Sequence, residues 1–307
     1  MKAVIATGYG PPEVLSVQDI PKPKPKKDEV LIKVMAASLN SGDVRMRALD
    51  GGDGLKGFIA KIVIRLLLGI PKPKRVPGSV FAGKIVEVGE NVTTFKVGDE
   101  VYAMAGFSFG GFGEYCALPI TRAIALKPKK ASYEQACTLP FGGNTSLYFL
   151  KKAGVSNGMN VLIYGSSGAV GTSAVQIAKH LGANVTAISG KDGMQLSKKL
   201  GAEKVFDYKT TDLSDLKLKF DVIFDAVGKI SQSKVAHLLV DDGKYITVDS
   251  LDVAKESSAD LEKLAKMFDS GTLVAIIDKT FTLDEIVEAN RYVDTGRKKG
   301  SVVIQIR

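Results

Sequence analysis

Three glycines, Gly165, Gly168 and Gly171, form the pattern in this sequence that is best suited to binding a phosphate. An apolar run at 161–164 precedes them, and apolar residues at helical spacing follow as far as residue 182. In such a strand, turn and helix, the glycines let the backbone approach a pyrophosphate, and the helix N-terminus offers it free N–H groups. A dinucleotide is the predicted ligand. The predicted contacts are Gly165, Ser166, Ser167, Gly168, Ala169, Val170 and Gly171.

Glycine spacing alone also occurs in ordinary loops, so the elements around the turn carry the prediction. Strands are predicted at 184–189, 204–207, 221–226 and 244–248, and helices at 194–200 and 231–240. Strands that alternate with helices in this way form a parallel, doubly wound sheet. The predicted fold class is therefore α/β, with a Rossmann nucleotide-binding domain.

The first 122 residues have a different pattern. Turn-forming residues recur at short intervals between strand-like runs such as 29–36, 84–88 and 100–104. An all-β region is predicted here. At the other end of the chain, strands are predicted at 274–277 and 301–306 with a helix at 283–294 between them, and a further helix is predicted at 259–268.

Composition limits the class of protein and its partners. The chain has 307 residues, 45% apolar and 24% charged, which is long enough for two domains of ordinary soluble composition. The formal charge of +9 is scattered, and no nucleic-acid motif accompanies it, so no nucleic-acid partner is expected. Cys116 and Cys137 have no metal-ligand spacing, and we find no targeting segment. A reducing, cytoplasmic location is expected.

Four segments give the chain a specific resemblance: 37–43 (ASLNSGD), 77–101 with its PGSVFAG and KVGDEV motifs, the glycine turn, and 200–208. They resemble the medium-chain dehydrogenase/reductase superfamily, in particular its zinc-free quinone oxidoreductase branch, which includes the chloroplast envelope quinone oxidoreductase homologues. The resemblance implies a GroES-like, β-rich catalytic domain at 1–124, to which 271–307 return, and an inserted Rossmann NADP(H)-binding domain at 125–270. It further implies a cleft between them in which NADPH reduces a quinone or an α,β-unsaturated carbonyl compound, a small, apolar electrophile.

The choice of nicotinamide cofactor depends on the end of the second Rossmann strand. NAD-preferring domains place an acidic residue there to bind the ribose, whereas this chain has Ser189, Gly190 and Lys191, which favour a 2′-phosphate. By resemblance, Tyr208 lies where related reductases place a Tyr beside the same phosphate. NADP(H) is therefore predicted, with two alternatives left open: Asp192 could reach the ribose, and Lys191 could simply be solvated.

The resemblance also bears on metal binding. A catalytic zinc needs three protein ligands, but the chain has only two histidines, His180 and His237, both in predicted helices. Ser79 and Val80 follow Gly78 where the zinc branch has His and Glu, and the four-cysteine zinc lobe is absent. No zinc is predicted. Val80 also replaces the Asp that is usual in the zinc-free branch, which puts any substrate contact through that position in doubt.

By resemblance, the predicted catalytic residues are Asn40, Asp43 and Thr145. The remaining predicted cofactor contacts are Val227, Gly228, Thr247 and Val248. Simpler roles stay open, because Asn40 and Asp43 could cap a turn or a helix and Thr145 could lie at a helix N-terminus. No dedicated general acid is identified, and Ser301 stands where relatives often have a cofactor-binding Lys.

Two stretches are unusual. Residues 58–70 are strongly apolar but too short to span a bilayer, which needs roughly twenty apolar residues. A helix covering the substrate cleft is predicted there, with peripheral membrane contact as the alternative. Residues 250–258 form a shorter connection than relatives have before helix 259–268, so the edge strand that pairs their subunits is expected to be missing. A monomer or an atypical dimer is expected.

The leading hypothesis is thus a zinc-independent, NADPH-dependent reductase of quinones or enones. Two alternatives remain: a carbonyl or alcohol dehydrogenase, and a non-catalytic NADPH-binding sensor, RNA-binding or structural protein.

Overall fold

The computed structural model describes residues 1–52, 54–249 and 252–306, which divide into two compact units. The first unit comprises Met1–Pro140, Glu256–Ala265 and Ile277–Arg307, and the second comprises Phe141–Lys255 and Lys266–Ile276. This division differs from the predicted domain boundaries, since it places residues 125–140 and 256–265 in the first unit and residues 271–276 in the second. Each unit is described by itself.

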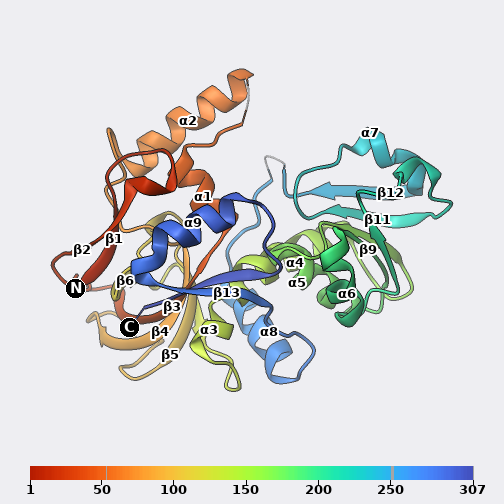
Figure 1. Ribbon diagram of the computed structural model, residues 1–307. Helices are drawn as coiled ribbons and strands as arrows, with labels where there is room; N and C mark the ends of the chain where they lie inside the picture. The colour runs from red at the N-terminus through yellow and green to blue at the C-terminus, as the bar shows by residue number, and fades with distance from the viewer. Residues whose placement is uncertain (53, 250–251, 307) are drawn as a thin grey trace. The chain divides into compact units, whose positions relative to one another are not determined.

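The second unit is built on a five-stranded parallel sheet (Figure 1). Its strands lie in the order β10-β9-β8-β11-β12. Their bounds are β8 Asn160–Tyr164, β9 Asn184–Ser189, β10 Lys204–Asp207, β11 Phe220–Asp225 and β12 Leu239–Thr247. The helices that belong to this unit in whole or in part are α4 Leu139–Ala153, α5 Ala169–His180, α6 Lys191–Lys199, α7 Gln232–Val235 and α8 Ser258–Asp269. All four strand pairings are parallel, so the predicted doubly wound sheet is confirmed.

The sheet forms where the sequence is apolar and β-branched. Val161, Leu162 and Ile163 of β8 are fully buried, as are Val185 and Ile188 of β9. Helix α5 buries its first ten residues, from Ala169 to Ala178. This burial on all sides explains why most side chains of the helix are small or apolar. The core thus fixes the position of the glycine turn between β8 and α5.

Two predicted elements are wrong. The helix predicted at 231–240 is only α7 followed by the 3₁₀ turn Ala236–Leu238, because Leu239 already pairs with Phe220 at the edge of the sheet. No strand begins at Val274, because the Gln176 side chain bonds both its N–H and its carbonyl, at 2.8 and 3.2 Å, in place of a neighbouring strand. Strand β13 begins later, at Ile277.

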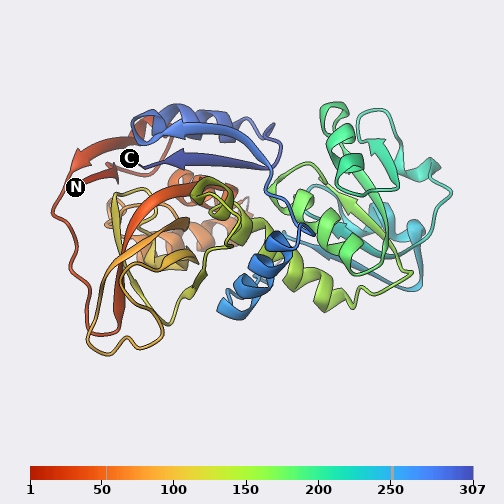
Figure 2. The same cartoon turned by 90° about the horizontal axis from the view of Figure 1, so that it is seen from below.

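The first unit contains a seven-stranded sheet, with the path β13-β14-β3-β4-β5-β7 and β6 paired to β3. Its strands are β3 Glu29–Leu39, β4 Val80–Val88, β5 Glu100–Met104, β6 Tyr115–Pro119, β7 Ala123–Leu126, β13 Ile277–Thr282 and β14 Ser301–Gln305. A separate pair consists of β1 Lys2–Ala6 and β2 Leu15–Asp19. Strand β14 runs antiparallel to β3, so the end of the chain completes a sheet begun by its N-terminal part (Figure 2).

The first unit also contains helices. Helices α2 Gly54–Leu68 and α9 Ile286–Asp294 correspond to those predicted at 58–70 and 283–294, whereas α1 Ser41–Ala48 and the short α3 Tyr133–Ala136 were not predicted. Helix α1 was missed because its residues lack an apolar stripe, and its N-terminus is formed by polar capping instead. Short 3₁₀ turns occur in this unit at Pro12–Val14, Gly106–Ser108 and Leu283–Glu285, and in the second unit at Leu213–Asp215.

Two observations concern the unusual stretches. Residues 250 and 251 lie outside the described residues, and 252–257 form no strand, so β12 stands at one edge of the described sheet. Helix α2 matches the apolar stretch, but no helix in the described part of the chain is both long and apolar enough to cross a membrane.

Candidate functional site

The glycine turn between β8 and α5 is packed too closely for larger residues. Gly165 has φ 77°, and a Cβ at Gly171 would lie 2.1 Å from the Gly165 carbonyl oxygen. Gly165 also faces Val227, whose Cγ1 would be 2.5 Å from an added Cβ. Gly165 is therefore required by its positive φ and by the closeness of Val227, and Gly171 by the close packing of α5 on the turn.

The middle glycine leaves open space at the N-terminus of α5. Gly168 is the N-cap residue, and no side chain caps the helix there. An added Cβ would have its nearest neighbour, the Gly165 carbonyl oxygen, at 3.7 Å. The first N–H groups of a helix have no acceptor within it, and the helix dipole favours an anion beside them. This part of the turn fits the predicted pyrophosphate.

The side chains of the turn have structural tasks. Ser166 is fully buried, and its hydroxyl lies 3.1 Å from the Ile188 carbonyl oxygen and 2.7 Å from Ser197 Oγ. Ser167 packs so closely on Gly193 that an added Cβ there would lie 2.5 Å from Ser167 Cβ. Ala169 and Val170 are buried at the start of α5. Any contact of this turn with a ligand is therefore mostly through the backbone.

A second helix N-terminus follows β9, the strand beside β8. Gly190 is the N-cap of α6, again without a side-chain cap, and Lys191 is exposed as the first helical residue. Tyr208 lies over Gly190, with its Cε1 3.3 Å from the position of an added Cβ. Ser189 is buried, and its hydroxyl donates to the Gly190 carbonyl at 3.1 Å. The structure thus brings Gly190, Lys191 and Tyr208 together, while the Ser189 hydroxyl is already engaged.

Sequence reasoning missed Asp225, the carboxylate that holds the predicted cofactor contacts Val227 and Gly228 in place. Asp225, at the end of β11, is fully buried and accepts the N–H groups of Val227 and Gly228 at 3.1 and 2.9 Å. It also accepts the Ile230 N–H at 3.0 Å and lies 3.4 Å from the Thr247 hydroxyl. An acidic residue that ends an apolar strand directly before a turn was the available signal.

Two predicted residues of the second unit remain. Val248 donates its N–H to the Asp225 carbonyl at 3.1 Å, so it continues from β12 beside the end of β11. Thr145 is half-buried inside α4, not at its N-terminus, and its hydroxyl donates to the Phe141 carbonyl one turn earlier at 2.7 Å. A contact from Thr145 to the nicotinamide stays a prediction.

In the first unit, Asn40 and Asp43 form a capping box at the start of α1. Asn40 Oδ1 accepts the N–H groups of Gly42 and Asp43 at 2.8 and 3.2 Å, and Asp43 Oδ2 accepts the Asn40 N–H at 3.1 Å. The alternative role that the sequence left open, helix capping, is therefore present. The capping geometry does not test a catalytic role for Asn40 or Asp43, which stays a prediction.

Ser79 joins the same network, and sequence reasoning assigned it no role. Asn40 Nδ2 donates to Ser79 Oγ at 3.0 Å, and the Ser79 hydroxyl and N–H both donate to Asp43 Oδ1, at 2.9 and 3.1 Å. The neighbouring Val80 is buried in β4, where it pairs with Ser38 and Met104. The three polar side chains are thus bonded to one another within an apolar surrounding.

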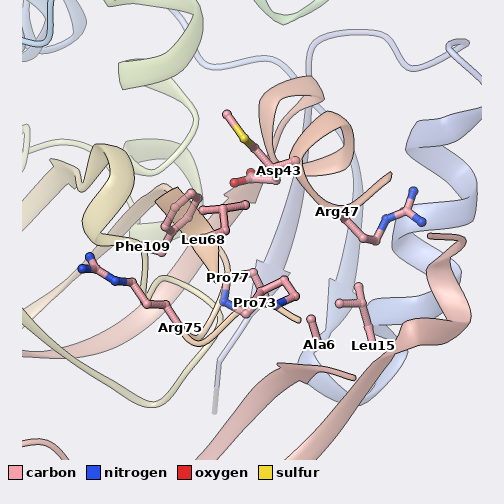
Figure 3. Close-up of a pocket in the computed structure, with 10 residues that line it drawn as sticks. Ala6, Leu15, Asp43, Arg47, Leu68, Pro73, Arg75, Pro77 and Phe109 are labelled. Atoms are coloured by element: carbon pink, nitrogen blue, oxygen red, sulfur yellow. The ribbon is translucent and has the colours of Figure 1, made fainter. Parts of the chain in front are cut away.

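Burial dominates the electrostatics of this network. It raises the pKa of Asp43 to about 6, although the hydrogen bonds from Asn40 and Ser79 lower it. One side of Asp43 faces a cavity of about 40 Å³, enough for a water molecule or two, whose apolar lining includes Leu68, Pro77 and Phe109 (Figure 3). Arg47 offers no compensating charge, because its guanidinium points away toward α9 and binds Asp294 at 2.7 Å.

Side chains that could bind a metal ion do not lie close together among the described residues. No group of three or more His, Cys, Asp or Glu that could hold a metal ion occurs among them. Cys116 and Cys137 are buried free thiols, and burial raises the pKa of Cys116 to about 12 and that of Cys137 well above its usual value. His180 and His237 are exposed, His180 at the end of α5 and His237 in the turn before β12.

Comparisons with known proteins agree with both units. Residues 26–129 match the family described as alcohol dehydrogenase GroES-like domain, and residues 169–277 match the family described as zinc-binding dehydrogenase. The 2-methylene-furan-3-one reductase of Solanum lycopersicum is 35% identical, across 99% of this chain and 79% of that protein. The chloroplastic NADPH-dependent alkenal/one oxidoreductase of Arabidopsis thaliana is 32% identical, with the same coverage of 99% and 79%.

A solved structure shows the same fold over the whole length. The quinone oxidoreductase from Coxiella burnetii superposes with a TM-score of 0.89 and 31% identity. The superposition covers 100% of this chain and 99% of that one.

Proposed function

The chain belongs to the quinone oxidoreductase branch of the medium-chain dehydrogenase/reductase superfamily, and from this premise we propose that it is an NADPH-dependent reductase of quinones or enones. The alkenal/one oxidoreductase and quinone oxidoreductase named above support this reaction class. Reduced nicotinamide supplies the hydride when it is bound. The protein's own residues have to hold it, orient the acceptor and favour charge on the acceptor oxygen.

The observation that carries the choice of cofactor is the pair of uncapped helix N-termini. Helices α5 and α6 both begin at a glycine without a side-chain cap, after the neighbouring parallel strands β8 and β9. Each can bind an anion, so the pair suits a dinucleotide that has a pyrophosphate and a further phosphate on its ribose. Lys191 and Tyr208 at the second terminus favour that further phosphate. We therefore assign the α6 site to the 2′-phosphate of NADP(H).

Asn40, Asp43 and Thr145 are proposed as the polar groups on the nicotinamide and substrate side. The capping box and Ser79 keep Asn40 and Asp43 in one fixed arrangement, which is what positioning requires. We propose that hydride transfer proceeds without zinc, since electron-poor acceptors of this class need no metal to accept a hydride.

The test is NADPH oxidation by metal-stripped protein, with NADH in parallel, against a panel of quinones and conjugated enones. Turnover with NADPH is expected, and the better acceptor class separates quinone from alkene reduction. Saturable NADPH binding without turnover on any acceptor would instead indicate a non-catalytic NADPH-binding protein. Alcohol oxidation that depends on stoichiometric zinc would indicate an alcohol dehydrogenase.

Lys191 gives a matched test of the cofactor assignment. Lys191→Ala removes a cation at the first residue of α6, whereas Lys199→Ala removes an exposed cation at the last residue of the same helix. The first variant is expected to raise the KM for NADPH roughly tenfold, in line with the loss of a charge-assisted hydrogen bond, and to leave the KM for NADH unchanged. An equal effect of both variants, or on both cofactors, would refute the assignment.

We also propose that the protein is a monomer or an atypical dimer. Strand β12 is an edge strand of the described parallel sheet, and residues 252–257 add no strand beside it. Sedimentation equilibrium over a wide range of protein concentration measures the oligomeric state, and amide hydrogen exchange measures whether β12 is covered. A stable dimer in which the amides of β12 exchange more slowly than in dilute, dissociated protein would indicate sheet pairing through this strand, and the proposal would then fail.

A further inference from the structure

Helix α2 exposes an unusual number of apolar side chains. Seven of the 15 exposed large apolar side chains among the described residues lie within residues 58–70. They are Phe58 at 62%, Ile59 at 52%, Ile62 at 44%, Val63 at 46%, Leu66 at 69%, Leu67 at 52% and Ile70 at 59%. Scattered exposed apolar residues are normal, but a contiguous group marks a surface that binds something.

The exposed residues lie on a face distinct from the one that packs on the first unit. Gly57 and Leu68 are buried and Ala60 and Ile64 half-buried, and this spacing of three and four residues defines one side of the helix. Phe58, Ile62 and Leu66 follow one another at intervals of four on another side. An apolar helix face is normally buried, so this exposed outer face lacks a partner among the described residues. We call it the α2 outer face.

The helix is held firmly enough to present this face. Its last carbonyl groups are bonded to the rest of the first unit: the Tyr9 hydroxyl donates to the Gly69 carbonyl at 2.7 Å, and the Lys74 N–H donates to the Leu68 carbonyl at 2.9 Å. Leu68 also lines the cavity beside Asp43. Figure 1 shows α2 standing out from the sheets of the first unit.

Helix α2 and the segment that follows it carry positive charges only, whereas Asp50 and Asp53 precede the helix. Residues 54–86 contain seven Lys or Arg and no Asp or Glu. Lys61, Arg65, Lys72 and Lys74 are exposed, and none of the ion pairs found among the described residues involves them. An apolar face with flanking cations is complementary to a surface whose interior is apolar and whose rim is anionic.

We propose that the α2 outer face binds the surface of a phospholipid bilayer that contains anionic lipids. The helix lies parallel to the membrane plane, with Phe58, Ile62 and Leu66 among the acyl chains and the lysines at the level of the phosphates. This contact is peripheral, because α2 has 15 residues and a bilayer span needs roughly twenty. A protein partner would also need an acidic rim around an apolar groove, whereas an anionic bilayer offers both properties at every point.

The experiment is flotation of the full chain with vesicles of phosphatidylcholine alone and of phosphatidylcholine mixed with phosphatidylglycerol. The wild-type protein is expected to float with the anionic vesicles and far less with the neutral ones. Three lysine-to-glutamine changes at 61, 72 and 74 are expected to weaken binding to anionic vesicles by at least roughly tenfold. The triple variant Phe58→Ser, Ile62→Ser, Leu66→Ser is expected to abolish it.

Matched controls separate this contact from general stickiness. Val97→Ser with Leu126→Ser removes two side chains that are 59% and 57% exposed outside α2, and should leave flotation unchanged. All substituted residues are exposed, so thermal unfolding should stay close to that of the wild type. Absence of flotation with anionic vesicles, or equal flotation of the triple serine variant, overturns the proposal. A concentration-dependent dimer that the triple serine variant abolishes, without vesicle binding, would overturn it in favour of contact between two copies of the chain.

Discussion

Ser79 binds the Asp43 carboxylate through two donors, its N–H at 3.1 Å and its hydroxyl at 2.9 Å, and both reach the same oxygen, Oδ1. The two residues are far apart in the sequence, so this contact joins the N-terminus of α1 to the residue before β4. Because the pKa of Asp43 is still raised to about 6, the desolvation of this carboxyl outweighs these bonds. Asp43 therefore titrates much closer to neutral pH than an ordinary carboxyl does.

The first prediction is a pH dependence of stability that comes from Asp43. Its pKa rises from 3.8 to about 6 on folding, so between these values the folded state binds more protons than the unfolded state. Its contribution to the free energy of unfolding is therefore full below about pH 4. It falls by about 3 kcal/mol in total as the pH rises through 6, and it stays low at higher pH. The measurement is urea unfolding of the wild type and of Asp43→Asn at several pH values.

The difference between these two proteins is the quantity to follow. Carboxyl groups with a lowered pKa, such as Glu100 and Glu285, contribute the opposite slope in both proteins and cancel in the difference. The wild type should lose stability relative to Asp43→Asn as pH rises from 4 to 7. A difference that is constant over this range would contradict the raised pKa.

A second prediction concerns Ser79 itself. Ser79→Ala removes the hydroxyl that stabilises the ionised Asp43, so the pKa of Asp43 should rise further above 6. At neutral pH the variant should be less stable by about 1–2 kcal/mol, because a buried carboxylate loses one donor. Carbon-detected NMR titration of the Asp43 carboxyl measures the first effect, with Ser16→Ala as the control. An unchanged or lower pKa would show that the hydroxyl does not stabilise the carboxylate.

These contacts show where sequence reasoning succeeds and where it stops. The glycine turn is predictable because most of its requirements are local: Gly165 has a positive φ, and the nearest neighbours of Gly168 and Gly171 are backbone atoms of residues 165 and 166. The doubly wound sheet is predictable because buried parallel strands such as 161–164 are apolar throughout. Both depend on short stretches of sequence.

The missed features depend on partners that are distant in the sequence. Ser79 contacts Asp43 only after β3 and β4 have paired. The Val274 N–H is bonded by the Gln176 side chain of α5 and not by a neighbouring strand. Asp225 was overlooked for a related reason: the sequence shows an acidic residue at the end of an apolar strand, but not the turn N–H groups that donate to its carboxylate. Resemblance supplied Asn40 and Asp43 as candidates, but their capping geometry had to come from the structure.

The third prediction compares two ion pairs that α9 makes with the N-terminal part of the first unit. Arg47 is buried and bonds both oxygens of Asp294, at 2.9 and 2.7 Å, whereas Arg291 and Glu13 form an exposed pair. Asp294→Asn should lower the free energy of unfolding by about 2 kcal/mol, because it leaves the buried guanidinium without its counter-charge. Glu13→Gln should have little effect, since solvent screens that pair. Equal losses in urea unfolding would contradict this account.

The last prediction separates anion binding at α5 from the stability of the helix. Gly168 is the N-cap of α5 with φ −77°, and an added Cβ has no neighbour nearer than 3.7 Å, so a larger residue fits without strain. Asp is a favoured N-cap residue and interacts well with the helix dipole, so Gly168→Asp should keep or raise the melting temperature. The same carboxylate would occupy the place of a phosphate and repel it, so NADPH binding should weaken by at least roughly a hundredfold. Gly168→Ala adds bulk without charge and should weaken binding much less. Calorimetric titration with NADPH and thermal unfolding of both variants test the two effects. If Gly168→Asp bound NADPH as the wild type does, the N-terminus of α5 would not be the phosphate site.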